Sequence, residues 1–185
     1  MSAAVENPYW MPFTANRDFN KQPRVITGAE GHWYTTDDGT RLYDMFSGLW
    51  TSGVGHCHPT IVEAVQQQVA KLDYCMGFQV TNDKALQLAE RVTAMAPDGI
   101  NHCFFTNSGS EAVDTALKIA LGYHRARGEG NRTRLIGREK GYHGVNFGGM
   151  SVGGIVPNRK VFSAALIPGV DHLRHTLDIE RNAFS

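Results

Sequence analysis

Apolar residues recur every three or four positions in three segments of the chain, which predicts three amphipathic helices. The first begins at Pro59, where a helix tolerates proline because the first-turn N–H has no partner anyway. The second begins near the cap residue Asn82 and ends by Met95. The third follows Glu111 and runs to about Arg125. Their inner faces are expected to consist of Ile61, Val62, Val65, Val69 and Leu72; of Leu86, Leu88, Ala89 and Val92; and of Ala112, Val113, Ala116, Leu117, Ala120 and Leu121.

Short runs typical of β-strands lie between and before these helices. Residues 33–36 and 41–45 flank Asp37-Asp38-Gly39-Thr40, and the Asp-Gly pair is a strong hairpin signal. Apolar runs predict further strands at 102–106, 134–137 and 164–167. Because strands alternate with helices, the predicted fold class is α/β, a mostly parallel sheet flanked by helices. An irregular segment through Pro23 and the hairpin precede it. Sites in such sheets lie at the C-terminal ends of the strands.

Length and charge narrow the class of protein. A domain of 185 residues is expected to bury roughly 70% of the surface that its unfolded form exposes, although the chain also fits part of a larger protein. Eighteen basic and eighteen acidic residues cancel, so neither nucleic acid nor an anionic membrane surface is an expected partner. No run of eighteen apolar residues is present to span a membrane. The opening segment is expected to pack through its aromatic residues, Tyr9, Trp10, Phe13 and Phe19.

The cysteines favour a cytoplasmic location. Cys57, Cys75 and Cys103 are odd in number and lack C-x-x-C spacing, which indicates reduced thiols and not a disulfide framework. The first seven residues show no basic stretch followed by an apolar one, as a secretory signal would.

The most informative motif lies where an expected strand ends and an expected helix begins. Residues 107–111 read Asn-Ser-Gly-Ser-Glu. At a helix N-terminus, free backbone N–H groups and the positive end of the helix dipole face outward together, which suits a phosphate. Gly109 permits close backbone approach, and Ser108 and Ser110 add hydroxyl donors. An ordinary helix cap, with Glu111 favoured in the first turn, explains the motif equally well.

Two aromatic positions carry two interpretations each. Tyr142 and His143 follow the expected strand 134–137 closely, so they project at the same edge of the sheet. Tyr142 is then either a ring that lies over a flat ligand or a core aromatic. Trp50, in the glycine-punctuated loop 47–55, is either the wall of a pocket or an edge-packing residue.

Metal and dinucleotide sites are not expected. His56-Cys57-His58 has a spacing that is poor for zinc, and no cluster of cysteines or carboxylates completes four ligands. The glycine-rich loop at 148–154 opens no obvious helix, so it supports a dinucleotide fold only weakly.

Taken together, the motifs resemble those of the class III aminotransferases, pyridoxal-phosphate (PLP) enzymes of fold type I. The resemblance covers nearly the whole chain and is carried by Asn107-Ser-Gly-Ser-Glu-Ala, Gly141-Tyr-His-Gly and Ser47-Gly-Leu-Trp. Segments 10–13, 47–51, 141–145 and 170–173 are most similar to ω-amino acid:pyruvate (β-alanine:pyruvate) transaminases. The stretch 142–152 is also similar to diaminopelargonate synthase. That enzyme, and a non-catalytic α/β phosphate-binding module, stay open as alternatives.

The resemblance implies the N-terminal part of the fold type I transferase fold. Residues 1–55 would belong to the small domain and residues 56–185 to the first part of the large cofactor-binding domain. The implied activity moves an amino group from an ω-amino acid or amine to pyruvate, with PLP as cofactor, in a homodimer. Residues that would bind the cofactor are Ser108, Gly109, Ser110, Tyr142 and His143. Residues that would line the substrate pocket are Phe13, Trp50 and Phe78, with Phe78 reaching toward the pocket of the partner subunit.

Three catalytic groups of the family have no counterpart in this chain. The resemblance implies a lysine that binds the cofactor covalently, an aspartate that pairs with the pyridine nitrogen and an arginine that binds the substrate carboxylate. All lie in the second half of the family's longer chains. The lysines present are Lys21, Lys71, Lys84, Lys118, Lys140 and Lys160, and none matches the tethering position. We therefore assign no catalytic residue, and we expect residues 1–185 to be an N-terminal fragment that is inactive alone.

Overall fold

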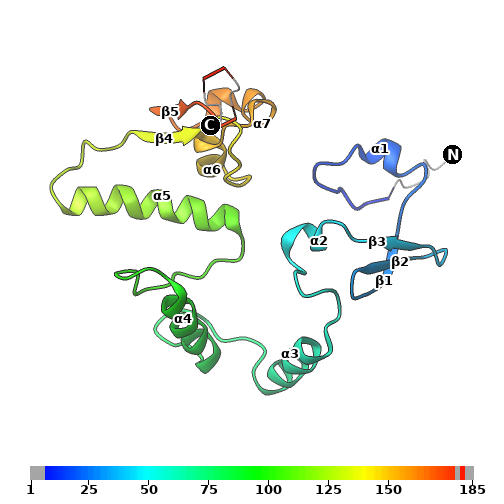
Figure 1. Cartoon of the computed structure of the whole chain (residues 1–185). Helices are drawn as coiled ribbons and strands as arrows, with labels where there is room; N and C mark the ends of the chain where they lie inside the picture. Colours follow the sequence, from blue (N-terminus) through cyan, green and yellow to red (C-terminus); the bar gives the residue numbers. More distant parts are fainter. Residues whose placement is uncertain (1–6, 178–179, 182–185) are drawn as a thin grey trace. The chain divides into compact units, whose positions relative to one another are not determined.

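The computed structural model describes residues 7–177 and 180–181. They belong to two compact units, Met1–Leu86 and Gln87–Ser185, whose helices and strands Figure 1 labels in chain order. The boundary between the units lies inside helix α4 (Asp83–Met95). The division at residue 55 that the resemblance implies stays a prediction.

The first unit is built on a three-stranded antiparallel sheet in the order β1–β2–β3. Its strands are β1 (Ile26–Glu30), β2 (Trp33–Thr36) and β3 (Arg41–Tyr43). The predicted hairpin is confirmed, because Trp33 pairs with Tyr43 and Thr35 with Arg41. The sequence did not predict β1, whose residues include glycine and glutamate, both uncommon in strands. Two short helices, α1 (Asn16–Phe19) and α2 (Ser47–Trp50), precede and follow the sheet along the chain.

The three predicted amphipathic helices are confirmed. Helix α3 (Pro59–Lys71) starts at its proline. The side-chain oxygen of Asn82 accepts a hydrogen bond from Ala85 N at 2.9 Å and so caps α4. Helix α5 (Gly109–Ala126) ends one residue beyond the expected position. Among the described residues, no helix is both long and apolar enough to cross a membrane.

The second unit packs helices against a pair of parallel strands. In this pair, β4 (Leu135–Arg138) and β5 (Val170–Leu173) align Leu135 with Val170 and Arg138 with Leu173. The crossover between them contains α6 (Phe147–Val152), α7 (Val156–Lys160) and a 3₁₀ turn, η1 (Ser163–Ala165). Helix α6 is the buried element of this unit: it contacts both strands and α5 (Figure 1). A parallel strand–helix–strand unit agrees with the predicted α/β class.

Three local predictions were wrong. Segment 102–106 forms no strand, because a strand requires a hydrogen-bonded neighbour and the described residues place none beside it. The run 164–167 is occupied by η1 and irregular backbone, and β5 starts only at Val170, beyond Pro168, which has no N–H to donate. The glycine-rich stretch 148–154, expected as a loop, contains most of helix α6.

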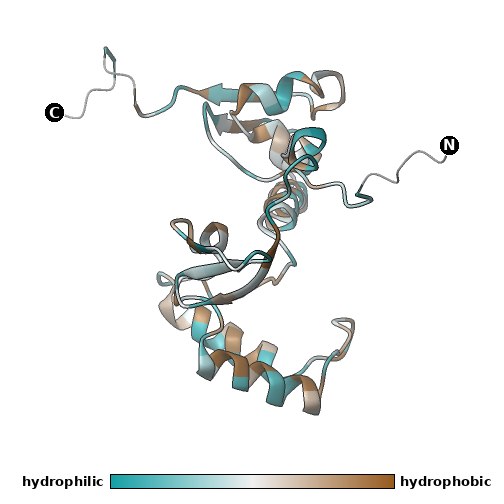
Figure 2. Cartoon of the chain, turned by 90° about the vertical axis from the view of Figure 1, so that its right-hand side faces the viewer, coloured by the Kyte–Doolittle hydropathy of each residue, from teal (hydrophilic) through white to brown (hydrophobic). Residues whose placement is uncertain are grey.

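The expected core is not closed within this chain. The chain exposes 15567 Å², whereas two independent folded bodies of half its length would together expose about 10,600 Å². Along the helices, hydrophobic positions alternate with hydrophilic ones (Figure 2), yet the inner-face residues Val65 of α3 and Leu86 of α4 stay more than half exposed. The opening aromatics Tyr9, Trp10 and Phe13 are exposed as well. The amphipathic faces therefore form without the surfaces that would cover them.

Candidate functional site

The segment at residues 107–111 leads into helix α5 as predicted, but the helix begins at Gly109, within the segment expected as a turn. Ser108 is the N-cap residue, and its Oγ accepts a hydrogen bond from Glu111 N at 3.2 Å. In return, Glu111 Oε2 accepts a hydrogen bond from Asn107 N at 2.9 Å. The cap interpretation of this motif is therefore realised, with the Ser108 hydroxyl as the acceptor.

The cap leaves an anion-binding group at the same turn. Within the described part of the chain, the backbone N–H groups of Gly109 and Ser110 have no hydrogen-bond acceptor. Ser110 Oγ accepts a hydrogen bond from Val145 N at 3.0 Å, which leaves the hydroxyl proton free to donate. With the positive end of the helix dipole behind them, two amides and one hydroxyl can bind an anion together.

The loop that carries Tyr142 and His143 lies against Ser110. Gly144 in this loop has a φ of +105°, and a Cβ atom there would come within 2.6 Å of Ser110 Cα. This close approach, with the hydrogen bond to Ser110 Oγ, fixes the loop beside the start of α5. The structure thus brings the two predicted ring-binding residues close to the predicted phosphate-binding ones.

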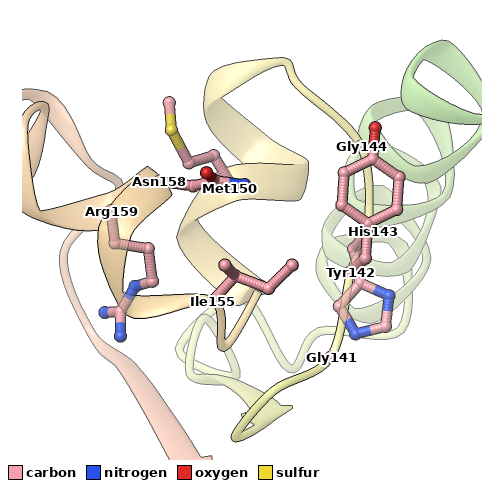
Figure 3. Close-up of a pocket in the computed structure, with 9 residues that line it drawn as sticks. Gly141, Tyr142, His143, Gly144, Met150, Ile155, Asn158 and Arg159 are labelled. Carbon is pink, nitrogen blue, oxygen red and sulfur yellow. The ribbon is translucent and has the colours of Figure 1, made fainter. Parts of the chain in front are cut away.

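A small pocket opens beside this loop. In Figure 3 the rings of Tyr142 and His143 stand on the loop, opposite side chains of the α6–α7 segment. These opposing residues are Met150, Ile155, Asn158 and Arg159. The ring of Tyr142 is more than half exposed in this chain, so a flat ligand has access to its face.

Asp114 takes part in the same packing and was not predicted. It lies one turn after Ser110 on the same face of α5, and its Oδ1 accepts a hydrogen bond from Gly149 N at 2.7 Å. A Cβ atom at Gly148 would come within 2.6 Å of that oxygen. The i, i+4 spacing was the available signal, because it directs both polar side chains of α5 toward one neighbouring segment.

Gly144→Ala should destabilise the fold more than the same change at an open turn. A Cβ atom at position 144 forces α5 or the loop to move, and overpacking of this kind costs about 1–3 kcal/mol beyond the backbone strain. Gly128→Ala is the matched control, because Gly128 has a φ of +80° and no atom within 4 Å of the Cβ position. Urea unfolding of the complete gene product should show the larger loss for Gly144→Ala. Equal losses at the two positions would contradict the close approach.

The three predicted substrate-pocket residues lie in the first unit with their side chains exposed. Phe13, Trp50 and Phe78 are 82%, 83% and 81% exposed. Each lies at or next to a non-glycine residue with positive φ, which is +49° at Phe13, +73° at Trp50 and +63° at Gln79. Strained backbone of this kind clusters at functional sites. The cofactor candidates belong to the second unit.

Trp50 ends α2, which is a single left-handed turn and not a regular helix, where the sequence indicated only a loop. The φ values along it are +49°, +60°, +57° and +73° for Ser47, Gly48, Leu49 and Trp50. A hydrogen bond of 2.8 Å from Trp50 N to Phe46 O closes the turn. Each non-glycine residue in this conformation costs about 1–2 kcal/mol, so other contacts must hold the turn.

A buried carboxylate provides such contacts. Asp44 accepts hydrogen bonds from Phe46 N at 3.0 Å and Gly48 N at 2.6 Å, and its Oδ2 lies 2.7 Å from His56 Nε2. The side chains of Asp44 and His56 are only 6% and 13% exposed. Burial acts to raise the pKa of Asp44, but hydrogen bonds from His56, the two amides and Tyr34 outweigh it and lower this pKa to about 2. Asp44 is therefore ionised at neutral pH.

His56 is held by contacts of both its side chain and its backbone. His56 pairs with Asp44, and its backbone N–H and C=O both bond to Gly31. No group of three or more His, Cys, Asp or Glu side chains in the described ranges is placed to hold a metal ion.

The low pKa of Asp44 predicts a stability difference that depends on pH. This carboxyl titrates near 3.8 when unfolded and near 2 when folded, so its contribution is complete above about pH 4 and is lost toward pH 2. Asp44→Asn removes this contribution. The gap in unfolding free energy between wild type and Asp44→Asn should therefore narrow from about pH 4 to pH 2, measured by urea unfolding of the complete gene product. A gap that is constant over this range would argue against an ionised Asp44 in the folded protein.

Sequence comparison groups the chain with aminotransferases. The family model for Aminotransferase class-III matches residues 14–183. An omega-aminotransferase of Caulobacter vibrioides is 54% identical over 174 residues, and a beta-alanine–pyruvate aminotransferase of Pseudomonas aeruginosa is 52% identical over 169 residues. These matches cover 94% and 91% of this chain but 39% and 37% of the relatives. The chain thus spans less than two fifths of the length of these relatives.

A solved structure shares the fold. An amine transaminase from an uncultivated Pseudomonas species, in its PLP-bound form, matches with a TM-score of 0.84 and 33% identity. The match covers 93% of this chain and 39% of that one. The predicted fold class, the N-terminal part of the fold type I transferase fold, is confirmed by this likeness.

Proposed function

We propose that this chain, which belongs to the class III aminotransferase family, forms the cofactor-phosphate site and part of the substrate pocket of a PLP-dependent ω-transaminase. The complete enzyme would move an amino group from an ω-amino acid or amine to pyruvate. The observation that carries this proposal is the anion-binding group of Gly109 and Ser110 at the start of α5. The names of the two relatives, an omega-aminotransferase and a beta-alanine–pyruvate aminotransferase, support the substrate class.

The described residues fit the phosphate of PLP. The free amides of Gly109 and Ser110 and the Ser110 hydroxyl would donate hydrogen bonds to it, each worth about 1.5–3 kcal/mol with a charged acceptor. Ser108 would act mainly through the cap that it forms with Glu111. When bound, PLP supplies the electron sink for amino transfer, which is chemistry that no protein side chain offers.

Tyr142 and His143 would hold the ring of the cofactor. The exposed ring of Tyr142 stands on a loop that is fixed against Ser110, so it would stack on a flat pyridine ring. His143 lines the same pocket and would border that ring. Neither residue is assigned a proton-transfer role.

Phe13, Trp50 and Phe78 would form the apolar walls of the amine pocket. Their aromatic side chains are exposed in this chain and lie at or next to residues with positive φ, the kind of strained backbone that clusters at functional sites. Aromatic walls suit amines that carry an apolar group. Phe13 and Trp50 would serve the pocket of their own subunit, and Phe78 that of the partner.

We expect the complete gene product to be a homodimer with Phe78 in or near the interface. Phe78 and Met76 lie between α3 and α4 on an apolar segment that is exposed in this chain and needs cover. Light scattering should give twice the mass of the subunit, and Phe78→Asp should shift the protein toward monomer. A strict monomer of the wild-type protein at micromolar concentration would refute the dimer.

Alanine formation tests the proposed function. The complete gene product, loaded with PLP, is given pyruvate together with β-alanine or a simple arylalkylamine, after host transaminases have been removed. Alanine should appear at a rate typical of enzymes, about 1–1000 per second. A folded, PLP-loaded protein that forms no alanine from either donor would overturn the proposal.

A further inference from the structure

The Trp50 side chain has few contacts of its own. The indole is 83% exposed, and in the described residues it takes part in no ring contact and no side-chain hydrogen bond. Nothing in its own contacts therefore fixes where it lies. The left-handed turn from Ser47 to Trp50 decides the direction in which the side chain leaves the backbone.

The turn is held by one carboxylate that lies just before it. Asp44 binds the amides of Phe46 and Gly48 through its two oxygens, at 3.0 and 2.6 Å. One of these amides precedes the turn and the other lies inside it. Both carboxylate oxygens are thus engaged in backbone contacts that define the left-handed path.

His56 connects this carboxylate to the three-stranded sheet. Its Nε2 lies 2.7 Å from Asp44 Oδ2, and its ring packs against Tyr34 of β2 with centroids 4.5 Å apart. Its backbone forms a two-way bridge with Gly31, through hydrogen bonds of 2.7 and 3.1 Å. A continuous chain of contacts therefore runs from the sheet through His56 and Asp44 to the Trp50 turn.

We propose that Asp44 and His56 are positioning residues for amine specificity: they fix the Trp50 turn to the sheet and so set the size of donor that the pocket accepts. The proposal rests on the proposed role of Trp50 in the amine pocket. Neither Asp44 nor His56 needs to touch substrate or cofactor. Their effect on the reaction passes through the place of one indole ring.

The test compares two donors in the complete, PLP-loaded protein. For each variant, kcat/KM is measured with β-alanine and with a bulky arylalkylamine, pyruvate being the acceptor, and the ratio of the two values is the readout. Trp50→Ala should change this ratio by about 10- to 100-fold, because removing the indole enlarges the pocket and so alters which size of donor it discriminates against. Asp44→Asn and His56→Gln should change it in the same direction. When Asp44→Asn or His56→Gln is combined with Trp50→Ala, the second substitution should add little further change in the ratio, since Asp44 and His56 act through that ring.

Asp38→Asn is the matched control. Asp38 also has a pKa lowered to about 2, and it also holds a tight turn, through hydrogen bonds from Thr36 Oγ1 and Thr40 N. Its turn belongs to the β2–β3 hairpin and not to Trp50. Asp38→Asn should lower the melting temperature and leave the donor ratio within about 2-fold of wild type, since the hairpin turn that Asp38 holds carries no residue of the proposed amine pocket.

The outcomes separate this proposal from the proposed function. A ratio that shifts in Trp50→Ala and stays at the wild-type value in Asp44→Asn overturns the positioning role alone. A ratio unchanged in Trp50→Ala overturns the role of Trp50 and the positioning role with it. If Asp44→Asn does not fold, the donor ratio is measured in Gly48→Ala instead. A Cβ atom at Gly48, where φ is +60°, would lie 2.9 Å from Ser52 Oγ and would distort the same turn. An unchanged ratio in that variant also counts against the proposal.

Discussion

Ser110→Ala should weaken PLP binding by about 10- to 150-fold in the complete gene product. The serine hydroxyl accepts from Val145 N at 3.0 Å and keeps its proton to donate to the phosphate. A hydrogen bond to a charged acceptor is worth about 1.5–3 kcal/mol, which converts to this change in Kd. The measurement is a titration of the cofactor-free protein with PLP, followed by absorbance.

Two controls locate the effect at the phosphate. Pyridoxal, which lacks the phosphate, should bind wild type and Ser110→Ala with nearly the same affinity. Ser108→Ala should cost about 1 kcal/mol of stability as a lost helix cap, because the Ser108 hydroxyl already accepts from Glu111 N. Its effect on Kd should be smaller than that of Ser110→Ala, because the proposed phosphate donors are the Gly109 and Ser110 amides and the Ser110 hydroxyl. Equal losses of PLP affinity in the two serine variants would contradict the assignment of roles within this turn.

Residues 1–185 alone should not catalyse transamination. None of the six lysines matches the position at which the family tethers its cofactor. A surface lysine that met the cofactor by chance would lack orientation, which is worth about 10⁵-fold or more in rate. The chain also exposes a large area, so the incomplete cofactor site would be open to water. Pyruvate consumption with β-alanine and added PLP should therefore stay at background, and turnover near one per second would reveal a site that this account lacks.

The sequence predicted well those features whose cause is local. Helices α3, α4 and α5 follow from apolar periodicity and from start signals at Pro59, Asn82 and residues 107–111. Helices α3 and α4 begin at these signals, and α5 begins at Gly109, earlier than expected. The hairpin follows from its Asp-Gly turn. The phosphate-binding turn was found for the same reason, because a helix N-terminus is visible in a stretch of five residues.

Features that depend on distant partners were missed. Helix α6 is rich in glycine, a poor helix former, and it is stable because those glycines allow close packing against Asp114 and the loop after β4. Segment 102–106 has the composition of a strand but has no described neighbour to pair with. The predicted burial of a full core failed because the helices form their apolar faces without the surfaces that would cover them.

The left-handed turn from Ser47 to Trp50 shows most clearly which features cannot be predicted from the sequence. Nothing in Ser47-Gly-Leu-Trp50 requires four successive positive φ values. The conformation depends on Asp44 and on His56, twelve positions further along, and only the folded sheet brings these two together. Sequence reasoning found Trp50 through a family resemblance but could not find the two residues that hold its turn.

The most direct test of the central claim is the activity of a hybrid protein. Residues 1–185 replace the matching segment of the Caulobacter vibrioides omega-aminotransferase, which is 54% identical to them. If this chain forms the cofactor-phosphate site and part of the amine pocket, the hybrid should bind PLP and form alanine from β-alanine and pyruvate at about 1–1000 per second. The same hybrid with Ser110→Ala should lose PLP on dialysis. A folded hybrid that retains PLP equally well with and without Ser110, or that forms no alanine while the parent enzyme does, would contradict the account.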